Sequence, residues 1–166
     1  MPATLTVPDP SLVLLVGVAG SGKSTLAARA FAPTQVLSTD AFRAMVADDP
    51  ADASAGGAAF ELLHRVTALR LARRLLTVVD ATNTWPDARA DLLDLARAHG
   101  VPAVAIVLDV PPRVCAARRP AVPVAVLRQQ RARLRAGLRD LPGEGFAAVH
   151  VLGADEVGTV TVAVGG

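Results

Sequence analysis

Aromatic residues are scarce in this sequence. They make up 3% of its 166 residues, and tyrosine is absent. The core of a folded domain must therefore be built mainly from Val, Leu and Ala, in a composition with 52% hydrophobic and 19% charged residues that is typical of globular chains. A nucleic-acid partner held by a platform of stacked aromatic rings is not expected from so few rings.

Long apolar runs are absent as well. No run approaches the roughly 20 residues that a membrane helix needs, and residues 1–9 lack the basic segment that begins a secretory signal. Cys115 is the single cysteine, which excludes an internal disulfide, and we interpret it as a small buried apolar residue. We therefore expect no membrane partner and a cytoplasmic location.

Lysine is almost missing, and its one position is informative. Of 17 basic residues only Lys23 is a lysine, and it lies in residues 17–25, GVAGSGKST. This stretch follows an apolar run and precedes an Ala/Leu-rich helical pattern, and it fits the P-loop motif G-x-x-x-x-G-K-[ST]. A compact ammonium suits this position better than a planar guanidinium. The pattern therefore favours a P-loop over a plain glycine-rich turn.

The chemistry of a P-loop explains these residue types. Glycines let consecutive backbone N–H groups turn toward a phosphate, and the following helix adds the positive end of its dipole. Lys23 would reach the β- and γ-phosphates of ATP or another NTP, and the Ser24 hydroxyl would bind Mg²⁺. The predicted nucleotide-binding residues are Gly17, Gly20, Ser21, Gly22, Lys23, Ser24 and Thr25.

Apolar runs alternate with helical patterns along the chain, which predicts an α/β P-loop kinase fold. We expect one domain over residues 1–166, with a parallel sheet of four to five strands and helices on both faces. Strands are predicted at residues 12–16, 35–38, 76–81, 102–109 and 149–152, with 160–164 as a further strand or an unpaired tail. Helices are predicted at residues 23–31, 41–46, 58–74, 86–98, 113–118 and 123–139, after a lead-in over residues 1–10 without a strand.

Ligands of such sheets bind at the carboxyl ends of the strands, where Asp40, Asp80 and Asp109 are predicted to lie. Asp40 closes the second strand, and Arg43 follows it at a spacing that lets both face one way. Asp40 could accept a proton from an acceptor hydroxyl, and Arg43 could brace a phosphate. A helix N-cap at Asp40 with a solvated Arg43 is the alternative interpretation.

Asp80 ends a second apolar strand, and a carboxylate there could support Mg²⁺ together with Ser24. Thr82 and Asn83 follow on the same rim and are short donors suited to an acceptor phosphate. Alternatively, Thr82 caps the next helix. The three histidines show no metal-ligand spacing and are interpreted as structural.

Eight arginines and no acid occur between residues 113 and 139. Such a block fits a polyanionic partner, or equally the solvated face of a helix in an arginine-rich chain. Arg118 and Arg119 precede a proline-containing bend, so the segment around residues 113–128 is predicted to be a lid. An arginine on a lid would stabilise charge in the transition state.

Several motifs together resemble one family, the kinase module of the bacterial RNA-repair polynucleotide kinase-phosphatases, which is related to the phage polynucleotide kinases. The likeness extends over roughly residues 5–155. The motifs, in order, are the P-loop, Ser38-Thr39-Asp40-Ala41-Phe42-Arg43, Gly57-Ala58-Ala59-Phe60, Thr77-Val78-Val79-Asp80-Ala81-Thr82-Asn83, Val114-Cys115 and Gly143-Glu144-Gly145-Phe146.

The resemblance implies transfer of the γ-phosphate of ATP or another NTP to the 5′-hydroxyl end of RNA or DNA, with a divalent metal. It matches Lys23 and Ser24 to the phosphate- and metal-binding pair and Asp40 to the general base. It also matches Arg43 to the acceptor and phosphate clamp, and Arg118 to the lid arginine. Thr82 falls at an acceptor-phosphate contact.

The sequence departs from the family pattern after Arg118, where residues 119–123 are shorter and mostly apolar, and in residues 48–57, which lack an expected glutamine. Phosphatase and ligase modules are not present in this chain, so it is either a domain of a longer protein or a free-standing relative. Two other functions stay open: a small-molecule kinase, and a nucleotide-dependent ATPase or switch without an acceptor.

Overall fold

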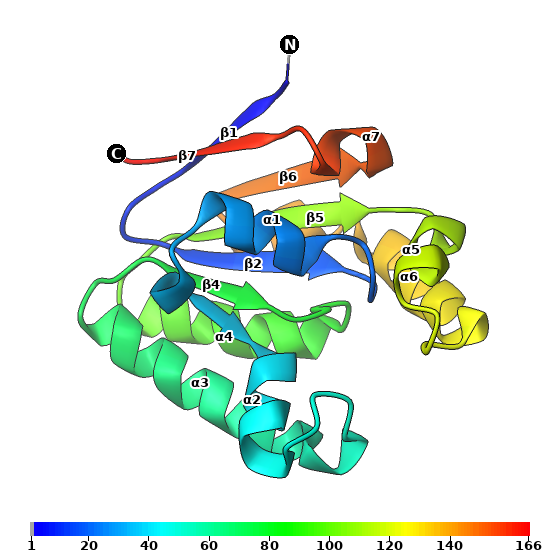
Figure 1. Cartoon of the computed structure of the whole chain (residues 1–166). Coiled ribbons are helices and arrows are strands. Elements are labelled where there is room, and N and C mark those ends of the chain that lie inside the picture. Colours follow the sequence, from blue (N-terminus) through cyan, green and yellow to red (C-terminus); the bar gives the residue numbers. More distant parts are fainter. Residues whose placement is uncertain (1) are drawn as a thin grey trace.

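The computed structural model describes residues 2–166 and contains a central parallel sheet with strand order β3-β4-β2-β5-β6. Helices cover both faces of this sheet (Figure 1), which confirms the predicted α/β P-loop kinase fold. Its strands are β2 (Leu12–Gly17), β3 (Val36–Ser38), β4 (Thr77–Asp80), β5 (Ala103–Asp109) and β6 (Ala148–Gly153). The helices are α1 (Lys23–Ala30), α2 (Thr39–Ala47), α3 (Gly56–Ala72), α4 (Pro86–Ala98), α5 (Pro112–Arg118), α6 (Val124–Gly137) and α7 (Ala154–Val157), with short 3-10 turns η1 (Pro33–Gln35), η2 (Ala53–Ala55) and η3 (Leu141–Gly143).

Alternate residues of β2 supply two separate hydrophobic cores, because successive side chains of a strand point to opposite faces. Val13 and Leu15 pack with α1, α5 and α7 on one face. Leu12 and Leu14 pack with α3, α4 and Leu134 of α6 on the other. Every residue of β2 is therefore buried, which explains its unbroken apolar sequence.

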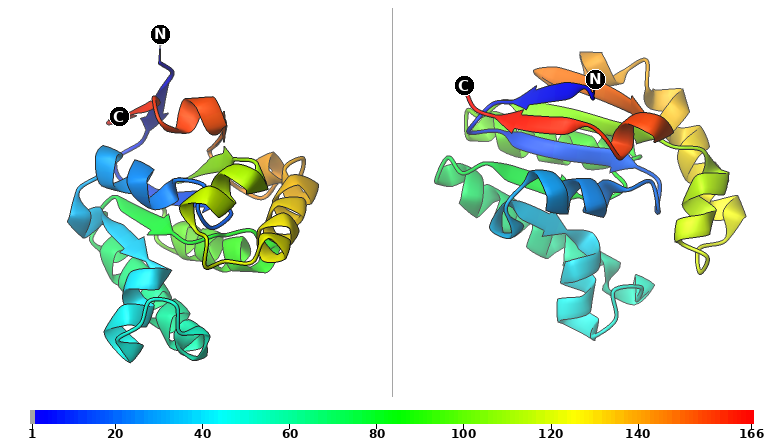
Figure 2. Two further views of the ribbon diagram at one scale, coloured as in Figure 1. Left: turned by 45° about the vertical axis from the view of Figure 1, so that its right-hand side comes forward. Right: turned by 45° about the horizontal axis from the view of Figure 1, so that its top comes forward.

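A second, two-stranded sheet lies beside the main one, and the sequence did not predict it. Strands β1 (Thr4–Val7) and β7 (Thr161–Val164) pair in parallel. The prediction of a strandless lead-in over residues 1–10 is therefore wrong, and residues 161–164 form a strand, not a tail. Leu5 and Val7 are buried against the core on the α1 side, and Figure 2 shows β1 and β7 side by side there.

Helix α2 begins earlier than predicted. Asp40 is the second residue of α2 instead of the end of a strand, because Ser38 caps the helix by accepting a hydrogen bond from the Ala41 N–H at 3.3 Å. The alternative in which Asp40 is a plain N-cap is therefore wrong. The carboxylate of Asp40 is left for other contacts.

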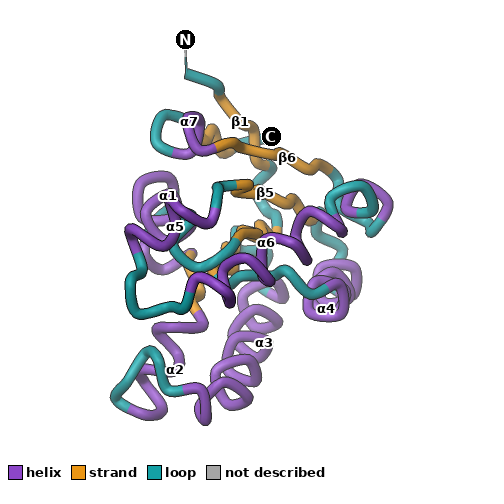
Figure 3. Tube along the Cα trace, turned by 90° about the vertical axis from the view of Figure 1, so that its right-hand side faces the viewer, coloured by secondary structure: helices purple, strands orange, loops and turns teal. Residues whose placement is uncertain are grey.

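Two helical projections flank the carboxyl ends of the strands. Helix α2 extends on one side and the α5–α6 hairpin on the other, and the P-loop lies between them (Figures 2 and 3). Among residues 2–166, no helix is both long and apolar enough to cross a membrane.

Candidate active site

The P-loop turns sharply between β2 and α1, and two of its glycines have conformations that favour glycine. Gly20 has φ of 80° and Gly22, the N-cap of α1, has φ of 101°. A Cβ on Gly20 would lie 2.6 Å from the carbonyl oxygen of Cys115 in α5. The loop is thus packed directly against α5, the first helix of the predicted lid.

Lys23 is buried and its ammonium is held inside the loop. Its Nζ donates to the carbonyl oxygens of Gly17 at 2.9 Å and Val18 at 2.8 Å. Burial lowers the pKa of Lys23 to about 8, although the charge of Asp80 opposes this shift. The ammonium lies within the P-loop and is incompletely solvated, and both features favour contact with a phosphate.

The predicted metal pair is in direct contact. The Ser24 hydroxyl donates to Asp80 Oδ2 at 2.6 Å, and Asp80 is 6% exposed. A hydroxyl and a buried carboxylate are the hard oxygen ligands that Mg²⁺ prefers. Within the described part of the chain no cluster of three His, Cys, Asp or Glu side chains could hold a metal. These two residues therefore fit a cation bound mostly by water and phosphate oxygens.

Asp40 and Arg43 form one wall of the site from α2. Arg43 Nη1 lies 2.8 Å from Asp40 Oδ1. The second oxygen of this carboxylate lies 3.9 Å from Nη2 of Arg119, which follows α5. Asp40 thus joins α2 to the residue that follows α5, and its carboxylate has a guanidinium on each side.

The opposite wall comes from α5 and α6. Arg118 Nη1 donates to the Gly20 carbonyl at 3.3 Å, and Gln130 Oε1 accepts from the Ala19 N–H at 3.1 Å. Sequence reasoning missed Gln130, because glutamine on an arginine-rich helix carries no local signal for a contact with the P-loop. Both contacts tie the α5–α6 hairpin to the P-loop in this conformation.

These groups surround one pocket of about 550 Å³. Four basic side chains and two carboxylates line it, so its charge suits a polyphosphate with a cation. Phe60 of α3 and Trp85 of the loop before α4 also line it, and neither was predicted. The lining includes Ala19, Gly20, Gly22, Lys23, Ser24, Thr25, Ser38, Thr39, Asp40, Arg43, Phe60, Asp80, Ala81, Thr82, Trp85, Arg118, Arg119 and Gln130.

Thr82 lies in the pocket, but Asn83 does not. Asn83 is buried, and its side-chain amide donates to the Leu15 carbonyl at 2.7 Å, so it links the chain after β4 to β2. The predicted acceptor contact of Asn83 is therefore not found in this conformation. Nor does Thr82 cap α4, since Trp85 occupies the N-cap position and makes no capping side-chain bond.

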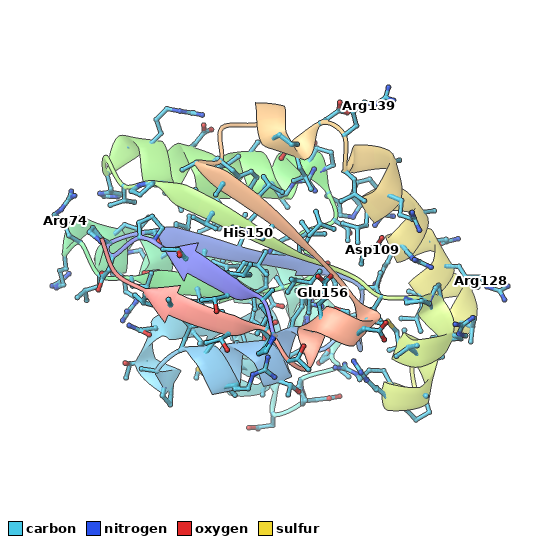
Figure 4. The ribbon with its side chains drawn as sticks, turned by 90° about the horizontal axis from the view of Figure 1, so that it is seen from above. Arg74, Asp109, Arg128, Arg139, His150 and Glu156 are labelled. Carbon is cyan, nitrogen blue, oxygen red and sulfur yellow. The ribbon has the colours of Figure 1, made fainter. Side chains whose placement is uncertain are left out.

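Much of the arginine block is engaged by the protein itself. Arg131 lies 3.2 Å and Arg135 3.8 Å from the Asp109 carboxylate, so Asp109 anchors α6 and does not line the pocket. Arg128 and Arg139 point away from the body of the domain (Figure 4). The charge available to a polyanion is thus smaller than the sequence indicates.

The chain also matches the model of a known domain family. A model described as the AAA domain matches residues 12–137. No curated protein matches the chain.

Solved structures share its fold. A putative kinase from Chloroflexus aurantiacus J-10-fl is 18% identical with a TM-score of 0.63, over 87% of this chain and 85% of that chain. A chain of the Pnkp1/Rnl/Hen1 RNA repair complex is 22% identical with a TM-score of 0.68, over 81% of this chain and 47% of the other. The Mycobacterium tuberculosis APS kinase CysC, in complex with AMPPNP and APS, is 22% identical with a TM-score of 0.55, over 90% and 91%. At these identities the likeness concerns the fold alone.

Proposed function

This chain belongs to the AAA domain family, and we propose that it is a polynucleotide 5′-hydroxyl kinase. Such an enzyme transfers the γ-phosphate of ATP or another NTP to a 5′-OH end of RNA or DNA. The observation that carries the proposal is the placement of Asp40, flanked by Arg43 and Arg119, in the pocket that also holds Lys23 and Ser24. An ATPase or switch without an acceptor has no need of such a carboxylate.

Phosphate binding is assigned to the P-loop. The N–H groups of residues 20–25 and the N-terminus of α1 hold the β-phosphate, and Lys23 contacts the β- and γ-phosphates. The phosphates would supply a negative charge next to the ammonium, which burial leaves poorly solvated. Ser24 and Asp80 would hold Mg²⁺, which neutralises charge on the phosphates when bound.

Asp40 is assigned the role of general base. It takes the proton of the acceptor 5′-hydroxyl as the new O–P bond forms to the γ-phosphorus and the bond to the β,γ-bridging oxygen breaks, which releases ADP. Arg43 orients the carboxylate and contacts the acceptor phosphate with Thr82. An arginine of the lid, Arg118 or Arg119, stabilises the transferring group.

The test is transfer of label from γ-labelled ATP to a 5′-OH oligonucleotide by wild type and Asp40→Asn. We expect transfer by wild type and a loss of roughly 100-fold or more in kcat for the variant, with ATP binding retained. Asp94→Asn is the matched control, because Asp94 pairs with Arg97 at the same helical spacing on the exposed side of α4. Equal rates for Asp40→Asn and wild type would contradict the assignment.

A small-molecule kinase is the second candidate. It is favoured by the pairing of Arg131 and Arg135 with Asp109, because this pairing leaves less positive charge for a nucleic-acid backbone. This function predicts Asp40-dependent transfer to a sugar or nucleoside but none to an oligonucleotide. Polynucleotide transfer, in contrast, should weaken steeply as salt is raised from 50 to 200 mM, because phosphate contacts release counterions.

A further inference from the structure

Trp85 carries a stacked cation at the edge of the pocket. It is the single tryptophan of the chain, and the guanidinium carbon of Arg133 lies 3.5 Å from the centroid of its ring. Arg133 also donates to Thr84 Oγ1 at 3.3 Å, so the arginine of α6 is fixed from two directions. The indole and guanidinium together form a rigid, planar surface.

Helix α4 does not require this ring. Trp85 is the N-cap residue of α4, but its side chain makes no capping bond, and Pro86 already favours the helix start. The side chain stays 58% exposed, although burying so large a ring would stabilise the fold. An indole held flat and exposed beside a pocket is better explained by a ligand than by packing.

The ring lines the same pocket as the residues proposed to bind the acceptor. It lines the pocket with Thr82, Asp40 and Phe60, whereas the phosphate-binding groups belong to the P-loop. Phe60 is itself 37% exposed. Two of the five aromatic residues of the chain therefore line the pocket in which an acceptor hydroxyl would approach Asp40.

We infer that Trp85, backed by Arg133, stacks on the nucleobase that neighbours the acceptor 5′-hydroxyl. Nucleobases stack on aromatic and guanidinium planes whatever their sequence, so this contact selects an end that carries a base and not a particular base. The inference rests on the proposed function and narrows its acceptor to a 5′-terminal nucleoside. Sugars and other acceptors without a planar ring leave the surface unused.

The charges on either side of the pocket indicate the path that a bound acceptor strand would follow. Beyond Asp40, helix α2 leads to the exposed carboxylates of Asp48 and Asp49, which repel a polyanion. Beyond Trp85 lies α6, whose Arg128 points into solvent (Figure 4). A strand whose terminal base rests on Trp85 would continue over α6.

The decisive kinetic experiment compares two acceptors and two proteins. The acceptors are one oligonucleotide with a 5′-terminal adenosine and the same oligonucleotide with an abasic 5′ sugar, both carrying the 5′-hydroxyl. In wild type the base should raise kcat/KM roughly 5- to 100-fold, mostly through KM. In Trp85→Ala this preference should vanish, and Trp85→Phe should restore most of it. The same preference in wild type and Trp85→Ala would overturn the inference.

A fluorescence titration tests binding without catalysis, because Trp85 is the sole source of tryptophan emission. The base-bearing oligonucleotide should quench this emission, and the abasic one should not; equal responses would overturn the inference. Arg133→Ala should weaken the quenching, with Arg139→Ala as the matched control. If wild type transfers no phosphate to either oligonucleotide, the proposed function fails, whereas base-dependent quenching still decides the stacking contact.

Discussion

Arg119 and Asp40 face each other across the mouth of the P-loop pocket, with Nη2 of the arginine 3.9 Å from Oδ2 of the carboxylate. Both side chains are about half exposed, at 49% and 46%, so the ion pair adds little to stability. A γ-phosphate entering between them would compete for the guanidinium. Arg119 is therefore suited to change partners, from the carboxylate of Asp40 to the phosphoryl group that is transferred.

Arg118 and Arg119, the two arginines of the predicted lid, should differ in their kinetic effects. Arg118 lies over the P-loop at Gly20, so Arg118→Ala should mainly raise KM for ATP. Arg119 lies beside Asp40, so Arg119→Ala should lower kcat by about 100-fold, as expected for loss of a charge that acts on the transition state. Steady-state kinetics with varied ATP separate these effects. The reverse pattern would assign the catalytic role to Arg118, as the family resemblance implies.

Asp80→Asn should raise the Mg²⁺ concentration needed for half-maximal activity by about tenfold, because the variant loses the carboxylate charge beside Ser24. The measurement is initial rate against Mg²⁺ at saturating nucleotide. Asp109→Asn is the comparison, since Asp109 also ends a strand of the sheet but pairs with Arg131. An unchanged Mg²⁺ requirement in Asp80→Asn would contradict the metal assignment.

Gly20→Ala should destabilise the domain by more than about 2 kcal/mol, because the new Cβ combines a left-handed backbone conformation with a contact to Cys115. Gly57→Ala is the matched control. It lies in the first turn of α3 with no atom within 4 Å of the new Cβ, so it should be neutral or stabilising by up to about 1 kcal/mol. Urea denaturation measures both. Equal effects would show that α5 does not pack on the loop as described.

The local parts of this fold were predictable from the sequence, and the long-range parts were not. The P-loop and the strand before it follow from a motif and an apolar run within residues 12–25, and the structure confirms both elements. The pairing of β1 with β7 joins residues 4–7 to residues 161–164, and neither segment carries information about its partner. The early start of α2 depends on a single capping bond from Ser38.

The site shows the same division. Lys23 and Ser24 were predicted from the P-loop motif, and Asp40 and Asp80 from their places at the ends of predicted strands; all four line one pocket. Gln130 was missed because its P-loop contact spans 111 residues. The arginine block was read from charge alone, whereas pairing with Asp109 removes two of its members from the surface available to a ligand.

A buried ion pair links α4 to the segment before β6. Arg89 is 1% exposed and contacts both oxygens of Glu144 at 2.8 and 2.7 Å, and it also donates to the Asn83 carbonyl at 2.9 Å. Arg89→Met should cost about 3 kcal/mol of unfolding free energy, because it leaves the carboxylate without its partner. Arg97→Met, which removes an exposed pair with Asp94, should cost no more than about 1 kcal/mol. Similar losses for both would contradict the buried role of Arg89.

Burial of Lys23 makes the stability of the fold depend on pH. Its pKa falls from 10.5 to about 8 on folding, so between these values the unfolded chain binds more protons than the folded one. Stability therefore rises with pH in this window, and the cost of the buried charge is fully present below pH 8. Relative to Lys23→Met, wild type should gain about 2 kcal/mol between pH 7 and pH 9.5. Urea denaturation without nucleotide or divalent cation measures this difference. A constant difference across the window would show that the ammonium is well solvated in the folded protein, so that a phosphate would have no buried charge to stabilise.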